Sequence, residues 1–505
     1  MARNEVKWGA ILSYGLIIIN AIYGLVITPF ILGRIGEIEY GVYKTIASLS
    51  TSLMVLDLGL GGTVMRYIAK YKSEENNNKI ESFISMALGE GVILIGIVII
   101  VCGVLYALLP TLYANGLNAN EMLLGKRLFV IMAFNLMLHI TENLLNGIIT
   151  GFNHFVFGNG MKLMRVVLRI FLIYGLLKWF NSALVLVAID LVLTLILLLV
   201  EYIYIHRVLH TRIRVSFTKW DKSVFGESFR YTALLFLTSI VAQMNNNLDN
   251  VVIGAVRGPS FVTIYSMGLL IFGMFENLST AISGVMLPTV TNLLRQDNGL
   301  EKVQKTIIQA GRVQFILLGA ALVGFAIIGR EFIYLWLGDG YKDVYVITLI
   351  LMIPSLLELC VNVCLSVLRA KNMLGFRTIV ITGTTVLNAV ITIIGVWLYG
   401  YLAAAIGTAI SFIIGSLIIM NIYYYKKLTF PMLKIYCEIF KGTWICLIFA
   451  GLATYLSSRY LFGTGWFSLI ANVGVFVIIY AIALICFGLN KNEKRNIPLL
   501  GKFLK

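Results

Sequence analysis

The chain has 505 residues, of which 59% are hydrophobic and only 13% are charged, and its mean hydropathy is +0.90. Soluble globular proteins carry about 25% charged residues, so this composition excludes a soluble domain and predicts a polytopic membrane protein. The formal net charge of +16 raises the possibility of nucleic-acid binding, which the positions of the basic residues exclude, as shown below.

Apolar stretches recur along the whole chain at the length of about 18 to 25 residues that a helix needs to cross a bilayer, and strand-like alternation is absent. The sequence therefore predicts an all-α fold with about fourteen transmembrane helices. The first span lacks a cleavage pattern and is followed at once by a second, so it is predicted to remain in the protein. The spans are predicted to begin near Ala10, Val42, Phe83, Leu128, Met161, Ala183, Tyr231, Phe261, Val313, Val344, Phe376, Tyr401, Ile435 and Phe467.

Basic residues gather on one side of this topology. Of the 40 Lys and Arg residues, 31 fall in segments that alternate along the chain, namely 1–7, 66–79, 162–169, 207–230, 295–312, 369–377, 426–441 and 491–505. This asymmetry follows the positive-inside rule and predicts a multi-pass membrane protein with both termini cytoplasmic. The basic loops are interpreted as topology signals and anchors for anionic lipids, not as a nucleic-acid surface.

The six cysteines lie in apolar runs, without the spacing of a metal site or a disulfide framework. Each is interpreted as a small packing residue. No metal or cofactor is predicted.

The two halves of the chain share an internal repeat. "HITENLLNGIIT" (139–150) and "SLLELCVNVCLS" (355–366) align at a separation of 216 residues, which pairs Glu142 with Glu358, Asn146 with Asn362 and a hydroxyl with a hydroxyl. "ILGRIGEIEYGVY" (31–43) similarly echoes "VIGAVRGPSFVTIY" (252–265). Chance similarity between apolar segments is the alternative.

The repeat predicts the domain organisation. Six spans separate equivalent positions, so both halves have the same orientation, as in transporters built from parallel repeats. We predict six-helix lobes at residues 1–215 and 216–430, related by a pseudo-two-fold axis along the membrane normal. Residues 431–505 would add two further transmembrane helices and a cytoplasmic tail.

Three segments carry a family resemblance. "ILGRIGEIEYGVYKTIASLSTSLMVLDLGLGGTVMRYIAKY" (31–71), "NLDNVVIGAVRGPSFVTIYSMG" (247–268) and "LWLGDGYKDVYVITLILMIPSL" (335–356) resemble segments of polysaccharide flippases. The chain is thereby identified as a member of the polysaccharide transporter family within the multidrug/oligosaccharidyl-lipid/polysaccharide exporter superfamily. The resemblance implies movement of an undecaprenyl-diphosphate-linked oligosaccharide from the inner to the outer leaflet by alternating access.

Amides cluster in the predicted seventh span, in the stretch "QMNNNLDN". Amides can both donate and accept hydrogen bonds, so they suit the hydroxyl groups of a sugar without the desolvation cost of a full charge. The candidate lumen residues are Gln243, Asn246, Asn247, Asp249 and Asn250. Interhelical hydrogen bonding is the alternative.

A diphosphate requires cations, ideally the fork of an arginine. Lys162, Arg165 and Arg169 lie at i, i+3 and i+7 on the predicted fifth span, and form one stripe. Arg257 and Arg369, near other span ends, are further candidates. The alternative for all of these is anchoring to lipid head groups by snorkelling.

Membrane-buried carboxylates are candidates for proton or sodium coupling, because burying their charge is costly. Glu142 and Glu358 are favoured because the repeat places them on equivalent faces. Both could instead neutralise arginines. His139, Asp57 and Glu276 are further candidates for coupling or lobe closure.

The predicted function is transport, not catalysis. No phosphate-cradling glycine loop or zinc-ligand spacing is present in the sequence. The alternatives are a multidrug exporter of the same superfamily and a membrane glycan polymerase.

Overall fold

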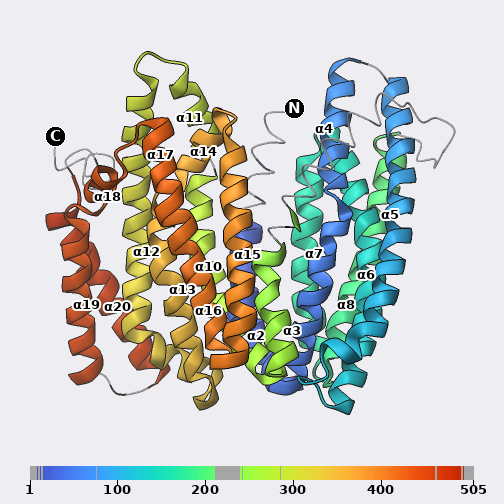
Figure 1. The fold of residues 1–505 in the computed structure, drawn as a ribbon, viewed down its shortest axis with the longest axis horizontal. Coiled ribbons are helices and arrows are strands. Elements are labelled where there is room, and N and C mark those ends of the chain that lie inside the picture. Colours follow the sequence, from blue (N-terminus) through green and yellow to red (C-terminus); the bar gives the residue numbers. More distant parts are fainter. Residues whose placement is uncertain are drawn as a thin grey trace. The chain divides into compact units, whose positions relative to one another are not determined.

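The computed structural model describes residues 8, 12, 15–75, 77–210, 239–240, 243–284, 286–460, 463, 465–490 and 493. These residues form helices joined by short connections and contain no strand (Figure 1). This confirms the predicted all-α membrane fold. Within the same ranges, eleven helices are long and apolar enough to cross a membrane, and a bent pair, Met432–Phe440 with Thr443–Arg459, makes a twelfth.

The other two predicted spans have identifiable counterparts. The fifth span corresponds to α7 (Phe155–Leu176), which has 22 residues but carries three cations on its polar face. The seventh was predicted to begin near Tyr231, and its first part lies outside the described residues, whereas residues 243–256 are helical.

The chain forms two compact units. The first consists of Met1–Thr263 with Ile393–Tyr401, and the second of Ile264–Thr392 with Leu402–Lys505. Helices α10 (Pro259–Ser283) and α15 (Leu374–Tyr399) contribute residues to both. The predicted lobe boundary at residue 215 lies outside the described residues, and that at residue 430 falls between α17 (Met420–Leu428) and α18 (Met432–Phe440).

Between residues 23 and 207, the described helices of the first unit follow one another along the chain with short connections. They are η1 (Tyr23–Ile27), α2 (Thr28–Ile35), α3 (Glu37–Ser52), η2 (Leu53–Asp57), α4 (Leu60–Ser73), α5 (Asn77–Leu112), α6 (Ala119–Gly151), α7 and α8 (Ala183–Arg207).

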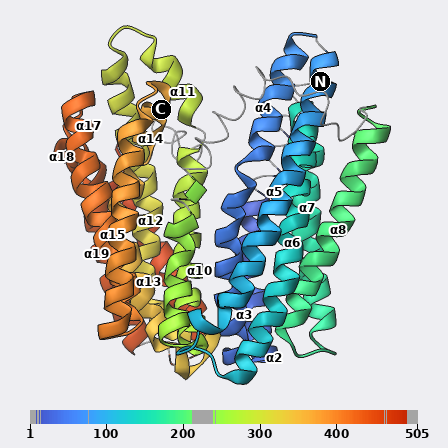
Figure 2. The same cartoon turned by 45° about the vertical axis from the view of Figure 1, so that its right-hand side comes forward.

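Helix α6 is the centre of the first unit, because α3, α4, α5 and α8 all pack against it (Figure 2). It begins at a capping box, in which Asn118 and Glu121 satisfy each other's backbone N–H groups. Close contact with α4 depends on glycine: a Cβ on Gly147 would lie 2.5 Å from the carbonyl oxygen of Gly61. Small residues therefore bring these two backbones together, as is usual between membrane helices.

The second predicted span is broken near its middle. Helix α3 ends at Ser52, a 3-10 turn follows to Asp57, and α4 starts at Leu60. Leu58 and Gly59 join the pieces with φ values of 55° and 68°, in the left-handed region that interrupts a right-handed helix. The break leaves backbone polar groups of this segment to be satisfied by other means, which is tolerated where a membrane helix is covered by protein or lines a cavity.

The second unit is organised around α12. Helices α13, α18, α19 and α20 pack against it (Figure 1). Its described elements, besides its parts of α10 and α15, are α11 (Met286–Leu294), α12 (Gly299–Leu337), η3 (Asp339–Tyr341), α13 (Lys342–Cys360), α14 (Val363–Ala370), α16 (Leu402–Ser411), η4 (Phe412–Ile419), α17 (Met420–Leu428), α18 (Met432–Phe440), α19 (Thr443–Tyr460), α20 (Trp466–Ala483) and η5 (Leu484–Gly488).

Candidate functional site

Helices α7 and α8 carry matching polar stripes. On α7, Arg165 and Arg169 lie one turn apart, and on α8 Asp190 and Thr194 are likewise spaced i, i+4. Arg169 Nε lies 2.8 Å from Asp190 Oδ1, and one of its terminal nitrogens donates to Asp190 Oδ2 at 2.8 Å. One turn away, Arg165 donates to Thr194 Oγ1 at 3.0 Å. The two helices therefore face each other through a short ladder of polar contacts.

Arg165 also bonds to α6. One terminal nitrogen donates to both carboxylate oxygens of Glu142, at 3.3 and 3.1 Å. The Arg165 side chain is 22% exposed and that of Glu142 is 10% exposed, so this pair is largely withdrawn from solvent. The predicted diphosphate ligand and the predicted coupling carboxylate are thus direct partners. This agrees with the alternative, raised from the sequence, that Glu142 neutralises an arginine of the fifth span.

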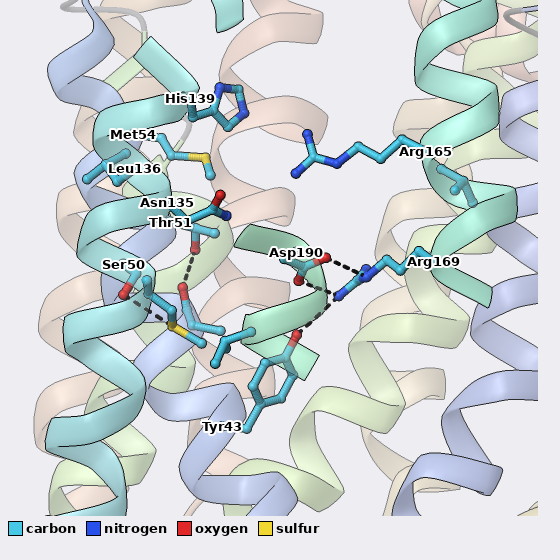
Figure 3. A pocket seen from close by; sticks show the side chains of 14 residues that line it. Tyr43, Ser50, Thr51, Met54, Asn135, Leu136, His139, Arg165, Arg169 and Asp190 are labelled. Carbon is cyan, nitrogen blue, oxygen red and sulfur yellow. Dashed lines mark hydrogen bonds and ion pairs between the residues drawn. The ribbon is translucent and has the colours of Figure 1, made fainter. Parts of the chain in front are cut away.

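Both arginines line a cavity of about 370 Å³ within the first unit (Figure 3). Figure 3 shows Arg165 and Arg169 extending from the same wall, with Asn135 and His139 on the opposite wall. Arg169 also lies 3.5 Å from the Tyr43 hydroxyl and 5.2 Å from the centre of the Tyr23 ring. The lining residues are Tyr43, Ala47, Ser50, Thr51, Met54, Met132, Asn135, Leu136, His139, Arg165, Val166, Arg169, Val187 and Asp190.

The broken second span meets α6 close to His139. Asn143 donates to Asp57 Oδ2 at 3.1 Å, and the other carboxylate oxygen of Asp57 is buried without a hydrogen-bond partner among the described residues. His139 interacts electrostatically with Asp57. Two of the predicted coupling residues therefore share one neighbourhood at the break.

The amide cluster of the predicted seventh span bonds mainly to α3. Thr51 donates to Asn247 Oδ1 at 3.0 Å, and Asn247 donates to Gln243 Oε1 at 2.8 Å. Asn250 donates to Ser48 Oγ at 3.1 Å. The Thr51–Asn247 and Asn250–Ser48 contacts are interhelical hydrogen bonds of the kind that the alternative interpretation of the cluster predicts, whereas the Asn247–Gln243 contact lies within one helix.

The remaining members of that cluster differ in exposure. Asp249 and Asn250 are buried, at 5% and 6% exposure, and Asn246 is exposed. Among the residues that line the 370 Å³ cavity, none comes from this cluster. The amide cluster therefore does not itself line the arginine cavity, although Thr51, which bonds to Asn247, does.

The two outlying arginines lie elsewhere. Arg257 donates to the carbonyl oxygens of Val396 and Trp397, both at 2.9 Å, near the C-terminal end of α15. This is a favourable place for a cation because helix C-termini expose unsatisfied carbonyls. Arg369 is exposed in the last turn of α14.

The second unit holds a counterpart of the Glu142 site. Glu358 is hydrogen-bonded to Ser416 and interacts electrostatically with Arg377, while Glu276 interacts with Glu358. The cavity at this position, which Glu358 and Arg377 line, measures only about 30 Å³. The larger cavity in the first unit is therefore the better candidate for a bound ligand.

Asp190 and Glu201 are among the membrane-buried carboxylates that the sequence offers for proton or sodium coupling, but they were not among the favoured site residues. Both lie on α8, where Asp190, Thr194 and Glu201 follow one face at i, i+4 and i+11. This helical spacing of polar residues within an apolar run was the available signal.

The described helices define a class: a multi-pass helical membrane protein. The solved structure of the lipid II flippase MurJ, in an inward closed conformation, is similar with a TM-score of 0.72 at 14% identity, over 95% of this chain and 98% of that one. An inward-facing multidrug resistance MATE family transporter of the MOP superfamily gives a TM-score of 0.63 at 15% identity, over 83% of this chain and 95% of the other.

The chain belongs to the polysaccharide biosynthesis protein family, whose model matches residues 6–294. It is also 27% identical over 211 residues to the probable flippase AglR of Haloferax volcanii. That similarity covers 41% of this chain and 44% of the relative. The family confirms the resemblance noted in the sequence.

Proposed function

We propose that this protein is a flippase that moves a polyprenyl-diphosphate-linked oligosaccharide from the inner to the outer leaflet by alternating access. The observation that supports this most directly is the placement of Arg165 and Arg169 on the wall of a cavity within the first unit. In a bacterium the lipid would be undecaprenyl diphosphate, and the cargo a repeat unit of a cell-surface polysaccharide.

The arginine contacts suit a reversible anion site. Arg165 is held by Glu142 and Arg169 by Asp190, so each guanidinium is kept in place by a carboxylate before any ligand arrives. The guanidinium fork matches phosphate oxygens as well as carboxylate oxygens. A diphosphate could thus take over contacts that the carboxylates provide in the unliganded protein.

The rest of the cavity suits sugars. Tyr43, Ser50 and Thr51 contribute hydroxyl groups, and Asn135 contributes an amide. Such neutral groups can donate to and accept from glycan hydroxyls at little desolvation cost. The amide cluster would then connect α3 to the seventh span, with the exposed Asn246 as its member most accessible to cargo.

The alternative transport function is multidrug export, because the similar MATE structure is that of a multidrug resistance transporter. Two guanidinium groups line the cavity, each paired with a carboxylate, and these arginine forks suit an anionic ligand better than the organic cations expected of a drug exporter. Glycan polymerisation has less support, because the named relatives are flippases and a transporter.

The proposed setting follows from the positive-inside rule. Both termini would be cytoplasmic, basic loops would contact anionic lipids, and a proton or sodium gradient could supply the energy for transport. Transport, and not chemical conversion of the lipid, would be the only activity.

The test is a flipping assay in proteoliposomes with a fluorescent polyprenyl-diphosphate disaccharide. The double variant R165Q/R169Q should lower the flipping rate at least tenfold, because both diphosphate ligands are lost. K178Q is the matched control, since Lys178 is an exposed cation just beyond the same helix. An unchanged rate in the double variant, at normal insertion, would contradict the proposal. ATP-independent export of a cationic dye by the wild type, without flipping, would favour the exporter.

A further inference from the structure

Glu201 is a buried acid that the proposed transport cycle has not yet used. It lies in the second half of α8 and is only 1% exposed. Its Oε1 accepts a hydrogen bond from Asn146 Nδ2 at 3.3 Å. Its Oε2 is buried and has no hydrogen-bond partner among the residues that the structure describes. A carboxyl group buried with one oxygen unsatisfied is expensive to keep charged.

The stripe of basic residues on α7 does not extend to Glu201. Towards the start of α7, the stripe of Arg169, Arg165 and Lys162 ends at Gly158. A Cβ at Gly158 would lie 3.3 Å from Nδ2 of Asn146, the same atom that bonds to Glu201. Helix α7 therefore meets the Asn146–Glu201 hydrogen bond with a residue that has no side chain. Glu201 accepts from an amide, whereas Asp190 and Thr194, which precede it on the same face of α8, accept from guanidinium groups.

Four groups act on Glu201. Glu142 repels it electrostatically, and Lys162 and Arg165 attract it, while Asn146 supplies the one hydrogen bond. Of the two cations, Arg165 is committed to Glu142 and Thr194, and Lys162 is exposed to solvent. His154 is hydrogen-bonded to the hydroxyl group of Tyr204, which lies one turn beyond Glu201 on α8, at 2.8 Å. No described cation is thus in direct contact with Glu201.

We propose that Glu201 binds a proton on Oε2, and that this proton determines whether Arg165 is free to hold a diphosphate. With the proton in place, Glu142 is the carboxylate that bonds to Arg165 and competes directly with a diphosphate, while Asp190, which also interacts with Arg165, is paired with Arg169. When the proton leaves towards water, Glu201 becomes a further anion beside Arg165, and the guanidinium is withdrawn from the ligand.

This inference rests on the proposed function, because it requires Arg165 to be a diphosphate ligand. Its direction follows from linkage: a ligand that binds the protonated form better must in turn favour proton binding. Diphosphate affinity should therefore decrease as pH rises through the ionisation of Glu201. A transport cycle could use this by loading cargo with a proton bound and releasing cargo as the proton departs.

The proton can be tested without any ligand. Purified wild-type protein in nanodiscs at neutral pH should show the infrared C=O stretch of a protonated carboxylic acid, and part of this band should be absent from E201Q. E81Q is the control, since Glu81 is exposed on α5 of the same unit. Identical carboxylic acid bands in wild type and E201Q would overturn the proton site, whatever the outcome of any binding experiment.

The coupling is tested with farnesyl diphosphate as the probe. Its affinity for the wild type and for E81Q should fall about tenfold from low to high pH, within the usual range of coupling between sites. E201Q carries a permanently neutral group and should retain high affinity at high pH. Equal pH profiles for wild type and E201Q would overturn the coupling. A sodium dependence of affinity that disappears in E201Q would replace the proton with sodium and also overturn it.

A second variant covers the case in which E201Q does not fold. Lys162 is exposed, so K162Q should insert normally, and it removes a charge that favours ionised Glu201. The midpoint of the pH-dependent affinity loss should then move upwards, and an unmoved or lowered midpoint counts against the coupling. Failure of the wild type to bind farnesyl diphosphate at any pH would remove the diphosphate site and the coupling, whereas the infrared result would still decide the proton.

Discussion

Arg169 and Asp190 form a two-pronged ion pair between consecutive helices, with both nitrogen–oxygen distances at 2.8 Å. Their side chains are 24% and 20% exposed, so the pair is only partly screened by solvent. The same guanidinium approaches the Tyr43 hydroxyl. The pair therefore both connects α7 to α8 and holds a cation at the wall of the cavity.

Removing the anion of this pair should separate its two roles. D190N is expected to lower the free energy of unfolding by about 2 kcal/mol, because a charged hydrogen-bonded pair is broken in a half-buried site. Arg169 then lacks its competing anion, so farnesyl diphosphate should raise the apparent melting temperature more in D190N than in the wild type. Thermal unfolding in detergent with and without the ligand measures both effects. Equal ligand-induced shifts would show that Arg169 does not take part in diphosphate binding.

Residues of the amide cluster should differ in their accessibility to water. In a cysteine-free background, a cysteine at Asn246 should react with a hydrophilic maleimide faster than one at Asn250, because Asn246 is exposed and Asn250 is 6% exposed. N250A should also lower stability by about 1 kcal/mol through loss of its bond to Ser48. Labelling rates in intact vesicles make the comparison. Equal rates at both positions would mean that the seventh span turns a different face to water.

The contact of α4 with α6 should not tolerate a methyl group. In G147A the new Cβ would meet the backbone oxygen of Gly61, which cannot move aside as a flexible side chain could. We expect a loss of about 1–3 kcal/mol in the free energy of unfolding. G103A on α5 is the matched control, because a Cβ there meets nothing within 4 Å, and alanine is the better helix former. Thermal unfolding of both variants tests this, and equal stabilities would contradict the close approach.

Arg312 joins the added C-terminal helices to α12. It is 3% exposed and donates to the carbonyl oxygens of Glu438 at 3.0 Å, Lys441 at 2.9 Å and Gly488 at 2.9 Å. Its Nε also donates to Glu493 Oε1 at 2.7 Å. Lysine cannot reproduce this fork, so R312K should lower the apparent melting temperature nearly as much as R312Q. A wild-type melting temperature in R312K would show that charge alone suffices.

Glu493 gives this connection a pH dependence. Partial burial raises the pKa of its carboxyl group, but hydrogen bonds from Arg312 and the Asn490 backbone outweigh this and hold the pKa below the ordinary value of 4.5. A lowered pKa contributes stability that is complete above the unfolded-state value and is lost as pH falls through the folded-state value. The difference in melting temperature between wild type and E493Q should thus be constant near neutral pH and shrink below about pH 4.5. A difference that grows on acidification would contradict this assignment.

The proposed topology is tested by cysteine accessibility in intact cells. Cysteines at Asn120 and Gly340 should react with an impermeant reagent, and cysteines at Glu74 and Asp297 should react only after permeabilisation. All four residues are exposed at helix ends, and the basic segments place the second pair inside. Labelling of a cysteine at Glu74 or Asp297 in intact cells would contradict the proposed orientation.

The sequence alone determined the class of fold. Long apolar runs specify membrane helices because the bilayer leaves every backbone group to be satisfied within its own helix. The stripe of Lys162, Arg165 and Arg169 was likewise readable, since 3.6 residues per turn fix which side chains share a face. The three quoted motifs also pointed to the family that the comparison confirmed.

Only the tertiary structure decided which groups meet. Helical periodicity orders residues on one helix, whereas the pairing of Arg165 with Glu142 and of Arg169 with Asp190 depends on the register and depth of three different helices. From the sequence, Asn247 and Asn250 were equally compatible with lining a lumen and with bonding to a neighbouring helix. In the structure, α3 places Thr51 and Ser48 within hydrogen-bond distance of them. Apolar residues facing lipid and apolar residues facing protein have the same composition, so the sequence carries little information about which faces come together.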